Sequence, residues 1–166
     1  LSPIQGGTCL RADDDKGTLW WPRQDPSIIV LVTNRNRDKA LLARSPRHPD
    51  KVHSALAGFV EAGETMEQAV IREVYEESGI RVDPDSISYL TSQPWPFPRS
   101  CMLAFRATAD DKQKISIDKK EIASADWFDK KQIELATGVD GAVMDATVAR
   151  QALINIPDIH VLVPPK

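Results

Sequence analysis

The sequence predicts an α/β protein, and two observations support that prediction. Residues 27–33 (SIIVLVT) form a continuous apolar, β-branched run that is typical of a strand buried in the middle of a sheet. Residues 66–78 have the features of a helix, and strand-like runs occur on both sides of it. With 166 residues and 42% hydrophobic content, the chain is long enough to bury a core, and one main domain is expected.

The other elements follow along the chain. The segment 1–16 is rich in Gly and Asp, which indicates a loop or a frayed hairpin. Residues 34–39 are a polar turn, and 40–44 are the returning strand. We further expect strands at 87–91 and 101–108, a segment at 121–128 that pairs with or abuts the sheet, and helices at 129–136 and 145–154.

The helix predicted at 66–78 has recognisable signals at both ends. Thr65 and Gln68 form a capping box, so the helix should begin near Met66. It should end at Ser78, because Gly79 readily adopts the left-handed conformation that terminates helices.

The predicted helix places acidic residues beside its apolar face. At roughly 100° per residue, one apolar stripe is formed by Met66, Val70 and Val74. Glu73 and Glu77 project into or beside this stripe, and Glu76 lies at its edge. A glutamate-rich helix usually has a solvated face, but carboxylates that point toward packed surface need partners. Arg72 is the only cation that the helix supplies, so a hard divalent metal ion is the expected partner for the rest.

The segment from Gly58 to Ile80 resembles the Nudix hydrolase signature, G-x5-E-x7-R-E-U-x-E-E-x-G-U, where U is an apolar residue. All nine fixed positions are present. The resemblance implies an α/β/α sandwich with a mixed central sheet and a loop-helix-loop catalytic motif. It also implies hydrolysis of a nucleoside diphosphate linked to another group, with Mg²⁺ or Mn²⁺ as cofactor.

The resemblance further assigns roles to individual residues. The implied metal ligands are the backbone carbonyl of Gly58 and the carboxylates of Glu73, Glu76, Glu77 and Glu121. Arg72 would orient Glu73, Glu64 would brace the loop, and either Glu73 or Glu77 would accept a proton as the base. Glu121 belongs to this set because the stretch 117–121 (IDKKE) is similar to one in the family; without the family it would be an ordinary exposed glutamate beside two lysines.

Residues 92–100 (SQPWPFPRS) form the second informative motif. Each proline removes a donor and fixes φ, so the segment should form neither a helix nor a central strand. It is either a rigid loop over the end of the core or a stiff aromatic platform for a planar ring. Its position after the first motif resembles the NADH pyrophosphatase subfamily. That resemblance implies cleavage of NADH or NAD to nicotinamide mononucleotide and AMP, removal of NAD caps from RNA, and substrate contacts from Gln93, Trp95 and Phe97.

Two further aromatic residues are candidates for substrate binding. Phe59 follows Gly58, where it could be a core side chain that anchors the loop. In relatives, this position stacks on nicotinamide, and a tyrosine before the first buried strand assists from the partner subunit of a homodimer. Here Trp21 precedes Pro22, so the ring is kept and the phenol hydroxyl is lost.

The net charge of −3 argues against a general nucleic-acid-binding protein. Cations nevertheless crowd the segment before the first motif: Arg35, Arg37, Lys39, Arg44, Arg47 and Lys51. They form either a solvated hairpin tip or an electrostatic guide for a pyrophosphate or for the body of a capped RNA. The three histidines, His48, His53 and His160, have no metal-ligand spacing and are interpreted as structural.

Cysteine use argues against a zinc site. Relatives usually carry a four-cysteine zinc ribbon upstream of the catalytic domain, but Cys9 is the only cysteine before the first motif, and no C-x2-C spacing exists. We therefore expect no structural zinc, a degenerate or truncated ribbon at 1–22 and a Nudix domain at 23–166. No pattern supports a disulfide with Cys101, which favours a reducing compartment.

No apolar run is long enough to span a bilayer, and the first residues given show no n-region and h-region pattern of a signal peptide. We expect a soluble intracellular protein, cytoplasmic or peroxisomal, without a membrane partner. Because it begins at Leu1, we expect a fragment. Two alternatives remain: a broader Nudix hydrolase of ADP-ribose or dinucleoside polyphosphates, which would generally lack the 92–100 motif, and a catalytically idle nucleotide sensor, which has no physical need for the full acidic set.

Overall fold

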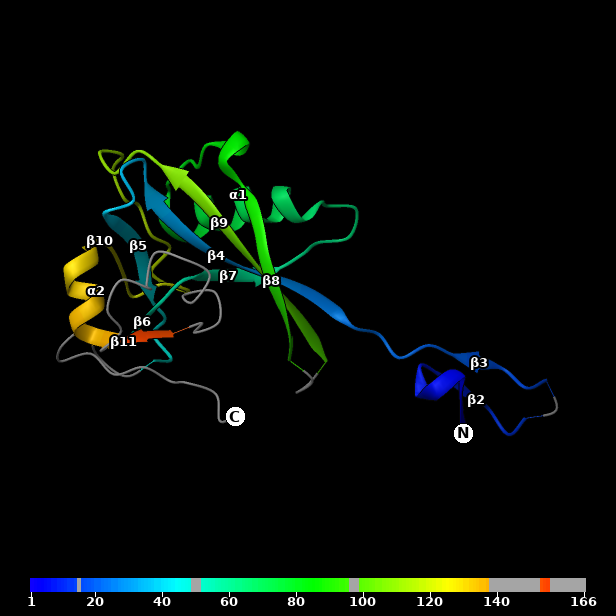
Figure 1. Ribbon diagram of the computed structural model, residues 1–166. Helices are drawn as coiled ribbons and strands as arrows, with labels where there is room; N and C mark the ends of the chain where they lie inside the picture. Colours follow the sequence, from blue (N-terminus) through cyan, green and yellow to red (C-terminus); the bar gives the residue numbers. More distant parts are fainter. Residues whose placement is uncertain (15, 49–51, 96–98, 138–152, 156–166) are drawn as a thin grey trace.

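The computed structural model describes residues 1–14, 16–48, 52–95, 99–137 and 153–155. A mixed eight-stranded sheet forms the main domain, and a small three-stranded sheet lies apart from it at the N-terminal end (Figure 1). No helix within the described ranges has the length and apolar character needed to cross a membrane.

The main sheet is mixed because two of its central strands are parallel. Its strands are β4 (Asp25–Asn34), β5 (Lys39–Arg44), β6 (Val52–Ser54), β7 (Leu56–Phe59), β8 (Ser88–Trp95), β9 (Ser100–Ala109), β10 (Ser124–Asp129) and β11 (Leu153–Asn155). The order is β11-β6-β5-β4-β9-β8, with β10 paired to β5 and β7 paired to β4. Strands β4 and β9 run parallel, and the other pairs are antiparallel. The predicted α/β class with a mixed sheet is confirmed.

Helix α1 (Met66–Ser78) has the predicted bounds. Thr65 donates its backbone N–H to Gln68 Oε1 (2.9 Å), and its hydroxyl accepts from the Gln68 N–H (3.2 Å), which completes the capping box. Gly79 ends the helix with φ of 72°, a conformation that other residues rarely adopt. Both helix signals read from the sequence are therefore confirmed.

The core lies mainly between α1 and one face of the sheet. The structure has two buried apolar clusters, and in the larger one Val70 and Val74 of α1 are fully buried against Ile28 and Val30 of β4. A smaller cluster on the opposite face contains Ile29 and Ala104. Alternate residues of β4 thus enter different clusters, which explains why the whole strand is apolar.

The segment 92–95 is part of β8 and is not a loop. Pro94 is tolerated because β8 lies at the end of the strand order, where a missing N–H does not interrupt a central ladder. The prediction that this motif avoids a central strand holds, but the alternative of a rigid loop is wrong for these four residues. The next three residues, 96–98, lie outside the described ranges.

The two ends of the chain also differ from expectation. The N-terminal segment forms β1 (Ser2–Ile4), a 3-10 turn (Gln5–Gly7), β2 (Cys9–Arg11) and β3 (Leu19–Trp20), which is more order than a frayed hairpin. The helix predicted at 145–154 is wrong at its end, because Leu153 and Ile154 belong to β11 and pair with β6. Sequence periodicity does not reveal such a distant strand partner. Residues 145–152 lie outside the described ranges, and helix α2 (Lys130–Thr137) matches the prediction at 129–136.

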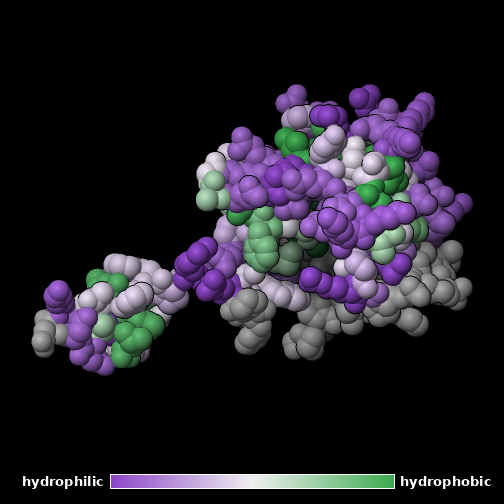
Figure 2. All heavy atoms as spheres, turned by 180° about the vertical axis from the view of Figure 1, so that it is seen from behind, coloured by the Kyte–Doolittle hydropathy of each residue, from purple (hydrophilic) through white to green (hydrophobic). Residues whose placement is uncertain are grey.

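Two shorter features complete the description. A second 3-10 turn (Pro84–Ser86) precedes β8, and the Asp83 side chain caps it. On the face shown in Figure 2, the main domain exposes mostly hydrophilic residues, interrupted by separate apolar patches.

Candidate active site

Arg72 is the centre of a hydrogen-bond network that joins α1 to the loop before it. Its Nε and Nη2 donate to the two carboxylate oxygens of Glu64, each at 2.9 Å. Nη1 donates to Glu73 (2.8 Å) and Glu76 (3.0 Å), and Nη2 also donates to the backbone carbonyl of Phe59 (2.9 Å). The paired contact with Glu64 requires the planar guanidinium fork, which lysine lacks. These contacts are the ones that an orienting Arg72 and a bracing Glu64 would need.

Position 58 requires glycine because there is no space for a side chain. Its φ is not in the left-handed region, but a Cβ at this position would overlap the carboxylate of Glu73. The chain of β7 therefore approaches the Glu73 side chain more closely than any other residue type would allow. This contact places the backbone of the loop and the carboxylates of the helix next to each other, as shared metal coordination would require.

Two carboxyl groups of α1, those of Glu73 and Glu77, have raised pKa values. Burial is the main cause that raises the pKa of Glu77, to about 8, and the negative charge of Glu73 adds to it. A backbone contact from Ala57 opposes that rise, while Glu121 contributes to it. Burial also raises the pKa of Glu73, although the hydrogen bond from Arg72 opposes the rise. By contrast, Arg72 lowers the pKa of Glu64.

These groups meet at one cavity of about 490 Å³. The cavity is lined by Ser45, Pro46, Arg47, Ala57, Gly58, Phe59, Glu61, Arg72, Glu73, Glu77, Lys120 and Glu121. Most of the residues predicted to act on metal or proton are thus together, although they come from β7, α1 and the turn before β10. Glu76 is not among the lining residues; its side chain is 54% exposed and contacts Arg72.

The donor set suits a hard divalent cation. Carboxylate and carbonyl oxygens are the ligands that such ions prefer, and a cation would favour the ionised form of Glu77, whose pKa is raised mainly by burial and further by the charge of Glu73. As they stand, no three acidic, histidine or cysteine side chains within the described ranges are gathered closely enough to hold a metal ion. Arg72 donates a hydrogen bond to one carboxylate oxygen of Glu73 and to one of Glu76. Binding of a metal ion would therefore require these carboxylates to move closer together.

Phe59 is 59% exposed, so the alternative that it anchors the loop in the core is wrong. It lines the site cavity and also a neighbouring cavity of about 540 Å³. In the strand registers, Phe59 is opposite Ser27, Ser27 is opposite Met102, and Met102 is opposite Gln93. Partners in register share a face, so Phe59 and Gln93 lie on one face of the sheet, about 14 Å apart across three strand spacings. Trp95, two residues after Gln93, shares that face.

The remaining predicted aromatic contacts are not placed at the cavity. Trp95 is 38% exposed on β8, and Trp21 is 62% exposed before β4. Neither lines the site cavity or its neighbour. Phe97 lies outside the described ranges. Roles for these residues in substrate binding remain predictions.

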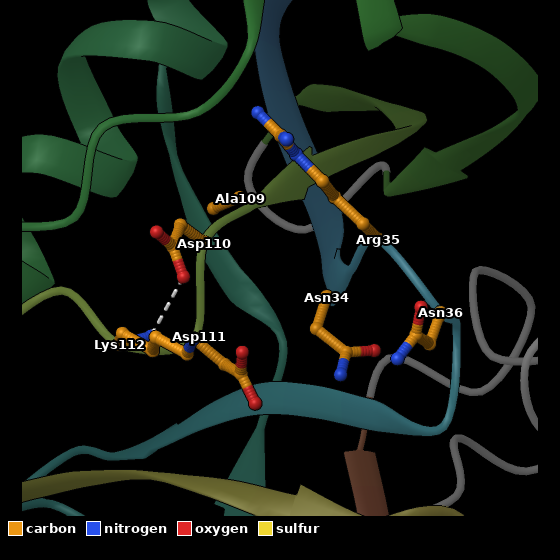
Figure 3. Close-up of a pocket in the computed structure, with 7 residues that line it drawn as sticks. All are labelled: Asn34, Arg35, Asn36, Ala109, Asp110, Asp111 and Lys112. Atoms are coloured by element: carbon orange, nitrogen blue, oxygen red, sulfur yellow. Dashed lines mark hydrogen bonds between the residues drawn. The ribbon is translucent and has the colours of Figure 1, made fainter.

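The basic run before the first motif is divided between the two ends of the β4–β5 hairpin. Arg35 and Arg37 are exposed at the turn, as a solvated hairpin tip predicts, and Lys39 pairs with Asp111 at 2.9 Å. Figure 3 shows the cavity of about 240 Å³ at this turn, lined by Asn34, Arg35, Asn36, Ala109, Asp110, Asp111 and Lys112. Arg47 follows the other end of β5 and lines the site cavity instead.

Other sequence candidates lie away from this chemistry. His53 packs edge-on against Phe128 with ring centroids 4.9 Å apart, in keeping with a structural interpretation, and His160 lies outside the described ranges. Cys9 and Cys101 are both free thiols. Sequence reasoning missed five cavity residues: Ser45, Pro46, Ala57, Glu61 and Lys120. For two of them the sequence offers a signal, because Ala57 directly precedes Gly58 and Lys120 directly precedes Glu121.

Comparison with known proteins agrees with the geometry. The family described as "NUDIX domain" matches residues 23–146, which is most of the chain. The chain is 55% identical over 109 residues to the NAD-capped RNA hydrolase NudC of Klebsiella pneumoniae subsp. pneumoniae and 54% identical over 109 residues to that of Salmonella typhi. Each match covers 66% of this chain and 40% of the relative, so the chain spans about 40% of the length of these curated relatives.

A solved structure supports the fold. The NUDIX hydrolase from Nitrosomonas europaea superposes with a TM-score of 0.62 at 22% identity, over 79% of this chain and 72% of that one. Members of the family generally use divalent metal ions. Because the family match extends over the loop, the helix and the sheet that form the site, the chain belongs to the Nudix family.

Proposed function

We propose that this chain hydrolyses the pyrophosphate of NADH or NAD to nicotinamide mononucleotide and AMP, with Mg²⁺ or Mn²⁺, and removes NAD caps from RNA. The observation that carries the proposal is the cavity that Glu73, Glu77 and Glu121 line together with an exposed Phe59. Support for the substrate comes from relatives named NAD-capped RNA hydrolase, at 53–55% identity. The motif at 92–100 supports the same substrate class.

In the proposed reaction, water attacks one phosphorus of the diphosphate, the bond from that phosphorus to the bridging oxygen breaks, and two phosphomonoesters leave. Glu73 or Glu77 accepts the proton of the attacking water. Burial raises the pKa of Glu77 to about 8, so a bound cation would be needed to keep this carboxyl ionised and able to accept a proton near neutral pH. Arg72 holds Glu73 in place through its Nη1 contact of 2.8 Å.

The metal ligands in this proposal are the Gly58 carbonyl and the carboxylates of Glu73, Glu76, Glu77 and Glu121. Bound divalent ions would polarise the phosphoryl oxygens and neutralise the leaving group. The carboxylates supply the negative charge that holds these ions, and the Gly58 backbone lies against Glu73. We further propose a homodimer in which Trp21 reaches the nicotinamide of the partner's site.

A turnover panel tests this proposal. NADH, NAD, ADP-ribose, diadenosine tetraphosphate and NAD-capped RNA are each incubated with Mg²⁺ or Mn²⁺, and the products are separated by chromatography. We expect AMP and the mononucleotide from NADH or NAD. Release of free nicotinamide would contradict pyrophosphate cleavage, and a strong preference for ADP-ribose would favour the broader Nudix hydrolase. A protein that binds nucleotides without turnover would be the idle sensor.

A further inference from the structure

We propose that Arg47 and Lys120 are diphosphate-binding residues that hold the phosphates of the substrate beside the carboxylates. This inference rests on the proposed function, because it concerns the same cavity. Both side chains line that cavity together with Glu73 and Glu77. No sequence pattern associates the two cations, because more than seventy residues separate them.

Strand pairing brings the two cations to one place. Strands β5 and β10 run antiparallel, with Ser124 opposite Arg44 in register. The N–H of Ala123 donates to the carbonyl of Arg44 at 2.8 Å, which extends the pairing. The chain leaving β5 toward Arg47 and the chain entering β10 from Lys120 therefore start from neighbouring positions and border the same cavity.

Local hydrogen bonds fix the backbone at both positions and leave the side chains exposed. The Arg47 N–H donates to Ser45 Oγ at 3.3 Å, and the Lys120 N–H donates to Asp118 Oδ1 at 2.9 Å. Among the ion pairs of the described residues, none involves Arg47 or Lys120. Arg72 differs, because its guanidinium is already bonded to three carboxylates. The two cations are thus available to a ligand.

The acidic lining of the cavity explains why the positive charges of Arg47 and Lys120 would help to bind a diphosphate there. A diphosphate is an anion, and it must approach a wall that contains Glu73, Glu77 and Glu121. Like charges repel at this range, so cations in the same cavity lower the free energy of the bound anion. The planar fork of arginine matches phosphate oxygens, and lysine supplies a compact positive charge. A free dinucleotide and the cap of an RNA present the same diphosphate.

Arg47→Ala and Lys120→Ala test the inference, with Arg35→Ala as the matched control. Arg35 is an exposed arginine on the same hairpin, and it lines the separate cavity at the turn (Figure 3). Gly58 pairs with Ile28, six residues before Asn34, which corresponds to roughly 20 Å along the strand. The measurements are KM and kcat for NADH and for NAD-capped RNA, and Kd for ADP and for adenosine by calorimetry.

We expect each cavity variant to raise KM about tenfold for both substrates with little change in kcat, which is the loss typical of one charge-assisted contact. The Kd for ADP should rise by a similar factor, while that for adenosine, which lacks the diphosphate, should not change. Arg35→Ala should match the wild type. Equal losses in the control, no loss in either variant, or a loss confined to the capped RNA would overturn the inference.

The same measurements distinguish a failure of the diphosphate site from a failure of the dinucleotide hydrolase activity. If the wild type hydrolyses no dinucleotide but ADP binding still weakens only in the cavity variants, the proposed function is wrong and the diphosphate site stands. If the wild type hydrolyses NADH and the two cavity variants have the same KM and Kd values as Arg35→Ala, the proposed function stands and the diphosphate site is wrong.

Discussion

Replacing Glu77 by Gln should stabilise the metal-free protein while removing its activity. The folded state keeps this carboxyl protonated up to a pKa of about 8, whereas the unfolded chain ionises it near 4.5. Between these two values the folded state binds more protons than the unfolded state, so the free energy of unfolding falls as pH rises. Glutamine carries no charge and removes this fall.

The size of the effect follows from the pKa shift. At pH 7 the full shift corresponds to about 3 kcal/mol, because each unit of pH between the two pKa values contributes about 1.4 kcal/mol. Partial exposure of the Glu77 side chain lowers the expected gain to about 1–3 kcal/mol. For a protein of this size, such a gain raises Tm by a few degrees to about 10 °C.

Thermal unfolding in chelator from pH 4.5 to 8 measures this difference between the variant and the wild type. Glu67→Gln is the control, because it removes the same charge from an exposed position in the first turn of α1. With Mg²⁺, Glu77→Gln should lower kcat at least about a hundredfold, the loss typical for general-base or metal-site groups. A Tm difference that does not grow with pH, or that also occurs in Glu67→Gln, would refute the electrostatic argument.

Three other substitutions test separate parts of the site. Gly58→Ala should displace the Glu73 carboxylate and lower kcat at least about tenfold with little change in Tm, because the overlapping group is the end of a flexible side chain; a large drop in Tm would contradict this. Phe59→Ala should weaken NADH recognition by about 1–3 kcal/mol, as for a base stacked on an aromatic ring, and affect smaller substrates less; a uniform loss in KM assays would argue against stacking. Trp21→Ala should be rescued in mixed dimers with a Glu77→Gln subunit, and absence of rescue would show that each site works alone.

The catalytic helix could be predicted closely from the sequence because its signals are local. Thr65, Gln68 and Gly79 act within one or two turns, so their effect does not depend on the rest of the fold. The burial of Glu73 and Glu77 followed from the same helical spacing. The role of Gly58 could be named from the family resemblance, but its close approach to Glu73 appears only in three dimensions.

The errors arose where distant segments meet. Residues 92–95 form a strand because β9 provides a partner and the sheet ends there, which leaves Pro94 at an edge. Leu153 and Ile154 likewise pair with β6. The basic run looked uniform in sequence, but the β4–β5 hairpin carries Arg35 and Arg47 to different cavities. Local patterns contain no information about such partners.

The distribution of charge within the site explains why one helix can be stable and also need a metal ion. Arg72 neutralises the side of the cluster formed by Glu64, Glu73 and Glu76. Glu77 does not receive a contact from Arg72 within the described ion pairs, and its pKa is raised by burial and by its acidic neighbours. Two acidic groups to which Arg72 makes no described ion pair, Glu77 and Glu121, line the cavity itself. An external cation stabilises the protein most at this point, so metal binding and the ionisation of Glu77 should be coupled.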